Sequence, residues 1–196
     1  MIHDVKIKKL KLLPDDRGFL MEMLRCDDEV YKGFGQVYIT GCIKGVAKGW
    51  HYHKEQTDHF VCVYGKALVV LCDTREGSPT YGRCQEFFLE APPAAGQGNN
   101  PPSPPFRKGG EVMDEMTNMT GRRGFLTPQE ESFGGHILLQ IPRLVMHGFT
   151  AYECDEARII NVPTLPYKYE KPDEYRYPWN SEEIPYKWPA YVTRGG

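Results

Sequence analysis

The sequence predicts an all-β protein of the jelly-roll sandwich or barrel type. Many short runs of β-branched and aromatic residues are separated by turns rich in glycine and proline, as in antiparallel sandwiches and barrels. No stretch shows the periodicity of a strong amphipathic helix, and no internal repeat is present. Aromatic residues make up 12% of the chain, and most are Tyr and Phe, which favour strands.

The expected strands follow one another from the N-terminus. Residues 5–13 and 17–24 lie on either side of a turn that contains Pro14 and Gly18. Residues 66–73 form a nearly continuous apolar run, which predicts a strand buried on both faces. Residues 27–33 are polar and could hold one helical turn. The other expected strands are residues 36–40, 46–53, 59–64, 84–89, 136–141, 146–152 and 158–162, and the Pro-, Tyr- and Trp-rich residues from 163 are expected to wrap irregularly over the body.

We expect one domain spanning residues 1–196, because this length suits a single domain with a sizeable core. Residues at about 91–135 form a Pro/Gly-rich insertion with 7 Pro and 8 Gly. Loops longer than about 12–15 residues are usually functional or disordered. We interpret the segment as an insertion tolerated in a surface loop, with a lid or partner arm as the alternative.

Composition excludes some functions. The net charge is −2, which gives no reason to expect binding to nucleic acid or to an anionic membrane. No apolar run is long enough for a transmembrane helix, and the first residues lack an apolar signal region. The six cysteines show no CxxC spacing, and four lie in or beside apolar runs, as buried free thiols do. We therefore expect a cytoplasmic protein without a disulfide framework.

The stretch from Gly45 to Gly65 concentrates chemistry-bearing residues. His51 and His53 are two residues apart, so in a strand both point to the same face. Asp58 lies at the edge of the next apolar run, and if the two runs are neighbouring strands it lies beside the imidazoles. His147 adds a third imidazole from later in the chain. Such a set can bind a metal or transfer protons.

The same residues follow the cupin signatures in spacing. Gly45, His51, His53, an acid and Gly65 match the first signature, with Asp58 in place of the usual Glu. Pro142 and His147 keep the spacing of the second signature, without its glycine. Metal-binding cupins hold a divalent ion at these positions. This resemblance makes His51, His53, Asp58 and His147 candidate ligands for Fe, Mn, Zn, Ni or Cu.

Nearly the whole chain outside the insertion resembles the dTDP-4-dehydrorhamnose 3,5-epimerase family of cupins. The matching segments are Asp-Asp-Arg-Gly-Phe-Leu-Met-Glu at residues 15–22, Gly-Trp-His-Tyr at 49–52, Asp-Thr-Arg-Glu-Gly-Ser-Pro-Thr-Tyr-Gly at 73–82, Ile-Pro at 141–142 with His-Gly-Phe at 147–149, and Trp-Asn at 179–180 with Ile-Pro-Tyr-Lys-Trp-Pro at 184–189. The resemblance implies a cupin jelly roll and a homodimer with an exchanged N-terminal strand. It also implies that the protein inverts carbons next to the ketone of a nucleotide-diphosphate 4-keto-6-deoxy sugar, and that it does so without a metal cofactor.

The resemblance also suggests roles for individual residues. His51 matches the base that removes a proton next to the ketone, and His147 matches a second histidine of the cavity. Residues on the substrate side are Arg17, Glu22, Gln36, Lys48 and Asn161.

Four positions depart from the family. Lys48 replaces an arginine, and His53 replaces a glutamine. The family's enolate-stabilising lysine falls on or beside Asp58. Its tyrosine acid aligns with Asn161, so Tyr167 or Tyr169 is a candidate replacement.

The leading interpretation is therefore an epimerase of nucleotide-linked 4-keto-6-deoxy sugars for surface polysaccharide or secondary-metabolite synthesis. The first alternative is a metal-dependent cupin enzyme with a three-histidine, one-carboxylate site; a metal-bound His51 would not be free to act as the base. The second is a non-catalytic module that binds a sugar nucleotide.

Overall fold

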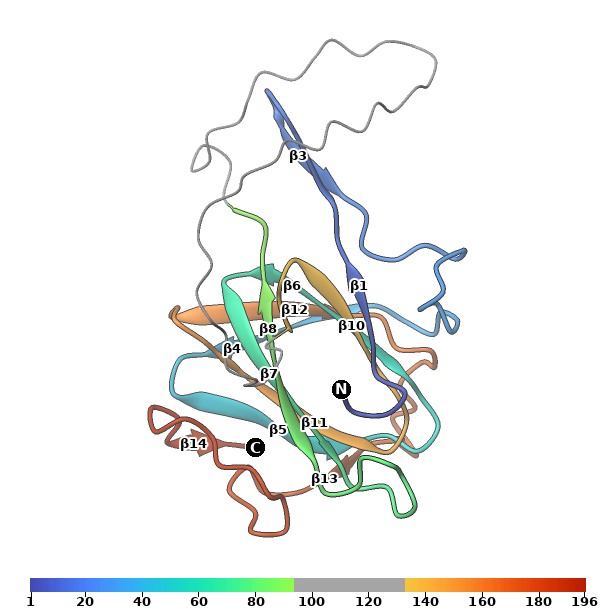
Figure 1. Cartoon of the computed structure of the whole chain (residues 1–196), viewed down its shortest axis with the longest axis vertical. Helices are drawn as coiled ribbons and strands as arrows, with labels where there is room; N and C mark the ends of the chain where they lie inside the picture. The colour runs from blue at the N-terminus through green and yellow to red at the C-terminus, as the bar shows by residue number, and fades with distance from the viewer. Residues whose placement is uncertain (94–132) are drawn as a thin grey trace, which may run out of the picture.

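A computed structural model describes residues 1–93 and 133–196 as a two-layer β-sandwich (Figure 1). Its strands, in chain order, are β1 (Lys6–Lys9), β2 (Leu12–Asp15), β3 (Gly18–Met21), β4 (Tyr38–Ile43), β5 (Val46–Tyr52), β6 (Asp58–Tyr64), β7 (Lys66–Asp73), β8 (Cys84–Glu90), β9 (Phe133–Gly135), β10 (Ile137–Ile141), β11 (Val145–Ala151), β12 (Glu156–Asn161), β13 (Tyr175–Arg176) and β14 (Arg194–Gly195). The all-β jelly-roll prediction is confirmed. The expected strand at residues 5–13 is interrupted and becomes β1 and β2, and the other expected strands are found within a few residues of their predicted bounds.

Two sheets face each other across the main core. One sheet has the order β1-β10-β6-β12-β4, and the other has the order β13-β5-β11-β7-β8-β9, with β14 pairing β5. β7 and β11 are buried along almost their whole lengths, as the apolar run at 66–73 predicts. Alternate side chains from both sheets fill the space between them, including Phe60, Val69, Phe149 and Ile159.

The hairpin of β2 and β3 extends away from the sandwich (Figure 1). Three of its apolar side chains, Leu13, Phe19 and Leu20, are 43%, 45% and 57% exposed. Hydrophobic side chains gathered on a projecting hairpin are typical of a surface that another chain covers.

Two local arrangements that the sequence left open are not found in the structure. Residues 27–33 form hydrogen-bonded turns rather than a helical turn. The runs that carry His51 and Asp58 become β5 and β6, which belong to opposite sheets instead of being neighbours. Pairing between strands depends on distant partners, which local periodicity does not specify.

The Pro/Gly-rich range lies almost wholly outside the described residues. Its last residues, Phe133–Gly135, form β9, which pairs in parallel with β8. Phe133 stacks on Phe87 of β8, with ring centroids 6.0 Å apart.

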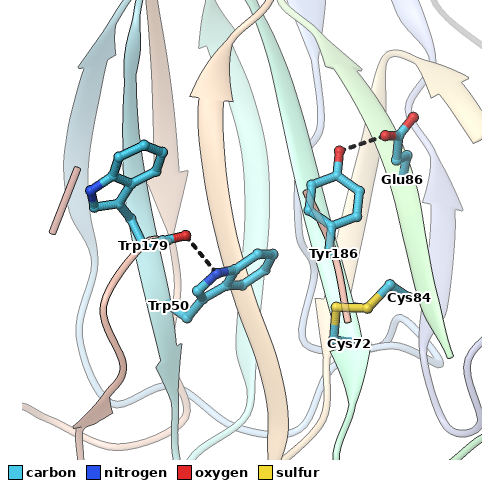
Figure 2. The surroundings of a disulfide bond; sticks show 6 residues. All are labelled: Trp50, Cys72, Cys84, Glu86, Trp179 and Tyr186. Carbon is cyan, nitrogen blue, oxygen red and sulfur yellow. Dashed lines mark hydrogen bonds between the residues drawn. A yellow bond between two sulfur atoms is a disulfide. The ribbon is translucent and has the colours of Figure 1, made fainter. Parts of the chain in front are cut away.

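The expected irregular tail wraps over the seven-stranded sheet. Trp50 is buried there against Trp188, and its indole N–H donates to the carbonyl of Trp179 at 3.0 Å (Figure 2). The tryptophans are thus packing residues, as large apolar side chains usually are.

A disulfide joins Cys72 of β7 to Cys84 of β8, contrary to the expectation of free thiols (Figure 2). The two cysteines occupy directly paired positions on neighbouring antiparallel strands, where side chains point to the same face. Cys26, Cys42, Cys62 and Cys154 are free. Within the described ranges, no helix is long and apolar enough to cross a membrane.

Candidate active site

Three histidines meet at one end of the seven-stranded sheet. His51 is near the end of β5 and pairs in register with His147 of β11, and their ring centroids are 4.1 Å apart. His53 follows β5 directly. One ligand atom from each histidine lies within 4.8 Å of the others. The structure therefore brings together the three imidazoles that the sequence singled out.

Asp58 reaches the same point from the opposite sheet. Its Oδ2 is 3.2 Å from Nε2 of His53 and 3.4 Å from Nε2 of His147. Its Oδ1 accepts hydrogen bonds from the side-chain amides of Gln56 at 3.0 Å and Asn161 at 2.9 Å. Because Asp58 is 1% exposed, these contacts replace water around the carboxylate.

Backbone carbonyls orient two of the imidazoles. Nδ1 of His53 lies against the carbonyl of Asp173, and Nδ1 of His147 is 3.0 Å from the carbonyl of Val145. A carbonyl only accepts, so each Nδ1 carries a hydrogen and each Nε2 faces Asp58. Nε2 of His147 is buried and, at 3.4 Å from Asp58, has no hydrogen-bond partner within normal geometry among the described residues.

The charges of the cluster follow from this geometry. Burial lowers the pKa of His51 well below its usual value, and the neighbouring His147 and His53 lower it further. Burial alone would raise the pKa of Asp58, but the imidazoles of His147 and His53 beside its Oδ2 hold it well below its usual range. Burial opposes a charge on His53, yet the hydrogen bond and charge of Asp58 raise its pKa overall. Asp58 is therefore ionised, and His51 is a neutral imidazole at pH 7.

A cavity of about 580 Å³ opens beside His51. Lys48 also lines it because Gly49 and Trp50 of β5 oppose the single residue Gly148 of β11. The extra residue turns positions 48 and 51 toward the same face. Lys48 donates to the hydroxyl of Thr40 on β4 at 2.9 Å. Apolar walls come from Trp50, Phe60 and Phe149, and the remaining polar side chains come from Tyr38, Glu174, Arg176 and Tyr177.

The other predicted substrate-side residues are scattered. Arg17 and Glu22 belong to the projecting hairpin and its exit, where they pair with Asp15 and Arg25. The side chain of Arg17 is 84% exposed. Gln36 accepts a hydrogen bond from the backbone N–H of Tyr167 at 3.1 Å, so it ties the later segment to the start of β4.

The two tyrosines proposed as replacement acids do not line this cavity. Tyr167 and Tyr169 contact each other with ring centroids 5.1 Å apart, and Tyr169 is 90% exposed. Asn161 contributes to the site as an internal hydrogen-bond donor, since it is fully buried between Asp58 and Tyr38.

Sequence reasoning missed Asp173 and Tyr38. Asp173 lies in a charged stretch that reads as a solvated face, yet its carboxylate accepts from the backbone N–H groups of residues 54, 55 and 56. Its carbonyl also contacts His53. Tyr38 begins a β-strand like many others, and only its pairing with Asn161 across the ladder places it at the site. No local sequence signal marks either contact.

Known proteins resemble this chain along its length. A family model for dTDP-4-dehydrorhamnose 3,5-epimerase matches residues 1–95. The spore coat polysaccharide biosynthesis protein SpsL of Bacillus subtilis is 31% identical over 188 residues, covering 96% of this chain and 97% of its own. The probable low-salt glycan biosynthesis epimerase Agl13 of Haloferax volcanii is 32% identical over 193 residues, covering 97% of both chains.

The fold has close counterparts among solved structures. The epimerase RmlC of Legionella pneumophila, crystallised with dTDP-4-keto-L-rhamnose, superposes with a TM-score of 0.68. The match covers 100% of this chain and 85% of that protein at 20% identity, so it supports the fold. Two relatives above 30% identity over nearly their full lengths establish descent. The chain belongs to the dTDP-4-dehydrorhamnose 3,5-epimerase family.

Proposed function

We propose that this protein epimerises a nucleotide-diphosphate 4-keto-6-deoxy sugar by removing a proton next to the ketone. The single observation that carries the proposal is the neutral His51 at the wall of a 580 Å³ cavity that also holds Lys48. A base must be unprotonated to accept a proton, and burial beside two other imidazoles keeps His51 in that form.

The cavity suits a substrate with a charged and a less polar part. Lys48 and Arg176 place cationic groups in its lining, where they can bind a diphosphate. Phe60 and Phe149 supply apolar wall for the deoxysugar. The names of SpsL and Agl13 refer to polysaccharide and glycan synthesis, which agrees with a sugar substrate.

Solvent exchange tests the proposed reaction directly. In D₂O, dTDP-4-keto-6-deoxyglucose should gain one deuterium at each centre that the enzyme deprotonates, measured by mass spectrometry and NMR. His51→Asn should slow this exchange by about 10²–10⁴-fold, the usual contribution of a general base. His3→Asn is the matched control, because His3 pairs with Asp4 on the surface. Binding of the sugar nucleotide without exchange by the wild type would leave only the non-catalytic binding module.

We also propose a homodimer in which the β2–β3 hairpin of one copy covers the other. The exposed Phe19 and Leu20 favour this arrangement, as does the outward face of the edge strand β4, where Ile39 and Ile43 are 59% and 51% exposed. The same exchange would carry Arg17 and Glu22 to a partner's cavity. Light scattering should give twice the chain mass, and Leu20→Asp should shift it toward the monomer. A wild-type monomer at micromolar concentration would contradict the proposal.

A cytoplasmic location is part of the proposal. The free Cys42 and Cys62 are buried and support it, whereas the disulfide between Cys72 and Cys84 is unusual in a reducing compartment. Thiol counting in protein purified with blocked cysteines measures the oxidation state of this pair.

The buried Nε2 of His147, which has no hydrogen-bond partner in the part of the chain that the structure describes, favours a metal enzyme as the second candidate function. Metal-ligating histidines typically donate Nδ1–H to a carbonyl and leave Nε2 for the ion, which is how His53 and His147 are held. With His51 and Asp58 they form a nitrogen-rich set that suits Zn, Fe, Mn, Ni or Cu. Such an ion would polarise a substrate oxygen. Since it would occupy His51, this candidate excludes His51 as the base.

Metal content and chelation separate the two candidates. Elemental analysis after dialysis should find about one transition-metal ion per chain if the second candidate is correct, and His53→Ala should lose it while His3→Asn keeps it. Chelator should then abolish turnover. Sub-stoichiometric content of every transition metal, with exchange unaffected by EDTA, would rule out the metal enzyme.

A further inference from the structure

We infer that Tyr38 is the acid that returns the proton to the deprotonated carbon, in place of the tyrosine missing at position 161. This inference rests on the proposed epimerase function. Asn161 of β12 and Tyr38 of β4 are directly paired in the antiparallel ladder. Side chains at paired positions lie on the same face, so the tyrosine hydroxyl is supplied from the neighbouring strand.

Because side chains alternate between the two faces of β4, the side chain of Tyr38 points into the cavity. Cys42 is buried in the core, and Thr40 binds the Lys48 ammonium at 2.9 Å. Tyr38 is two residues before Thr40, so all three side chains share the inner face while Ile39 points outward. Tyr38 and His51 line the same cavity, one from each of the two facing sheets.

The hydrogen bonds of Asn161 leave the hydroxyl proton of Tyr38 free to donate. The Oδ1 of Asn161 accepts from the backbone N–H of His59 at 3.0 Å, which fixes the orientation of the amide. Its Nδ2 then donates both hydrogens, one to Asp58 and one to the hydroxyl oxygen of Tyr38, each at 2.9 Å. Within residues 1–93 and 133–196, no acceptor takes the hydroxyl hydrogen of Tyr38, so a substrate carbon in the cavity can receive it.

The surroundings also keep this phenol protonated until it reacts. Partial burial and the charge of Asp58 raise the pKa of Tyr38 to about 12, although 41% of the residue stays exposed. In the reaction, His51 takes the C–H proton and the electron pair moves into the ketone as an enolate. The enolate carbon then forms a C–H bond as the O–H bond of Tyr38 breaks. Water reprotonates the phenolate and accepts the proton from His51, so the substrate is only isomerised.

Separate measurement of exchange and inversion tests this role in the full-length protein. Tyr38→Phe should still exchange the substrate proton with D₂O at no less than a tenth of the wild-type rate, because His51 can return deuterium to the original face. Formation of the inverted sugar should fall by at least 100-fold, within the range expected for an acid. Tyr169→Phe is the matched control and should keep both rates, since Tyr169 is 90% exposed and does not line the cavity.

Each other outcome overturns the inference. Inversion by Tyr38→Phe within fivefold of the wild type excludes Tyr38 as the acid, and so does equal loss of exchange and inversion in a variant that still binds the sugar nucleotide. If Tyr38→Phe does not bind, 3-fluorotyrosine at position 38 should change the inversion rate and leave exchange unchanged; no change in inversion would also exclude Tyr38. Absence of exchange in the wild type would refute the proposed function itself.

Discussion

Replacing Asp58 with alanine removes the acceptor on which four buried side chains converge. The amides of Gln56 and Asn161 lose their 3.0 and 2.9 Å hydrogen bonds, and His53 and His147 lose the carboxylate that faces Nε2. One unsatisfied buried polar group costs about 1–3 kcal/mol, and breaking a buried ion pair costs about 3–5 kcal/mol. We expect Asp58→Ala to lower the free energy of unfolding by about 3–5 kcal/mol, since the losses share one site and do not add fully.

Asp58→Asn is the matched comparison. The asparagine oxygen can still accept from Gln56 and Asn161, and its NH₂ group can donate to Nε2 of His53 and His147 once both imidazoles are neutral. This variant loses the charge but few hydrogen bonds. Its expected cost is about 1 kcal/mol, the difference between charged and neutral hydrogen bonds.

Urea unfolding followed by tryptophan fluorescence measures both variants, because Trp50 is buried close to the site. Protein concentration is held constant, since dimerisation would make stability depend on it. Equal stability of the alanine and asparagine variants would refute the reasoning that unsatisfied partners dominate. So would an alanine variant within about 1 kcal/mol of the wild type, given the penalties above.

Three further predictions concern stability and packing. Burial would raise the pKa of Asp73, but hydrogen bonds from Arg75, Ser78 and Thr80 lower it, so the ionised carboxylate stabilises the fold fully above the ordinary pKa of 3.8 and less as the pH falls. Between pH 5 and pH 3 the wild type should therefore lose more free energy of unfolding than Asp73→Asn. Equal losses in the two proteins would contradict this role of Asp73. Serine at both Cys72 and Cys84, 12 residues apart, should cost about 3 kcal/mol by loop entropy in urea unfolding, whereas an unchanged midpoint would show that the bond adds no stability. Gly148→Ala places a Cβ 2.9 Å from the carbonyl oxygen of Lys48, so it should lower the free energy of unfolding by about 1–3 kcal/mol. It should also slow deuterium exchange into the substrate, because the strained strand displaces His147. Wild-type values for both quantities would show that β5 can move aside.

Local patterns in the sequence were sufficient to predict most of the strands of the fold. The continuous apolar run at 66–73 identified β7, because a strand buried on both faces needs apolar residues throughout. Motif spacing also identified all four members of the cluster around Asp58. That the side chains of His51 and His53 lie on the same face follows from the two-residue period of an extended strand alone.

Contacts between distant segments were not predictable in this way. The sequence left open whether the strands of His51 and Asp58 are neighbours, and the structure places β5 and β6 in opposite sheets, so the contact crosses the core. The pairing of Cys72 with Cys84 depends on the register of β7 and β8. The contact of Asp173 with His53 joins residues 120 positions apart.

The sequence by itself determined the β-sandwich, the family and the identity of the three histidines and the carboxylate. These features depend on local periodicity and on residues at fixed spacing. Only the tertiary structure decided that Asp58 contacts the histidines from the opposite sheet and that Tyr38 lies against Asn161. It also decided that Nε2 of His147 finds no hydrogen-bond partner among residues 1–93 and 133–196. Each of these depends on strand pairing and sheet packing, whose register is set by the whole core rather than by neighbouring residues.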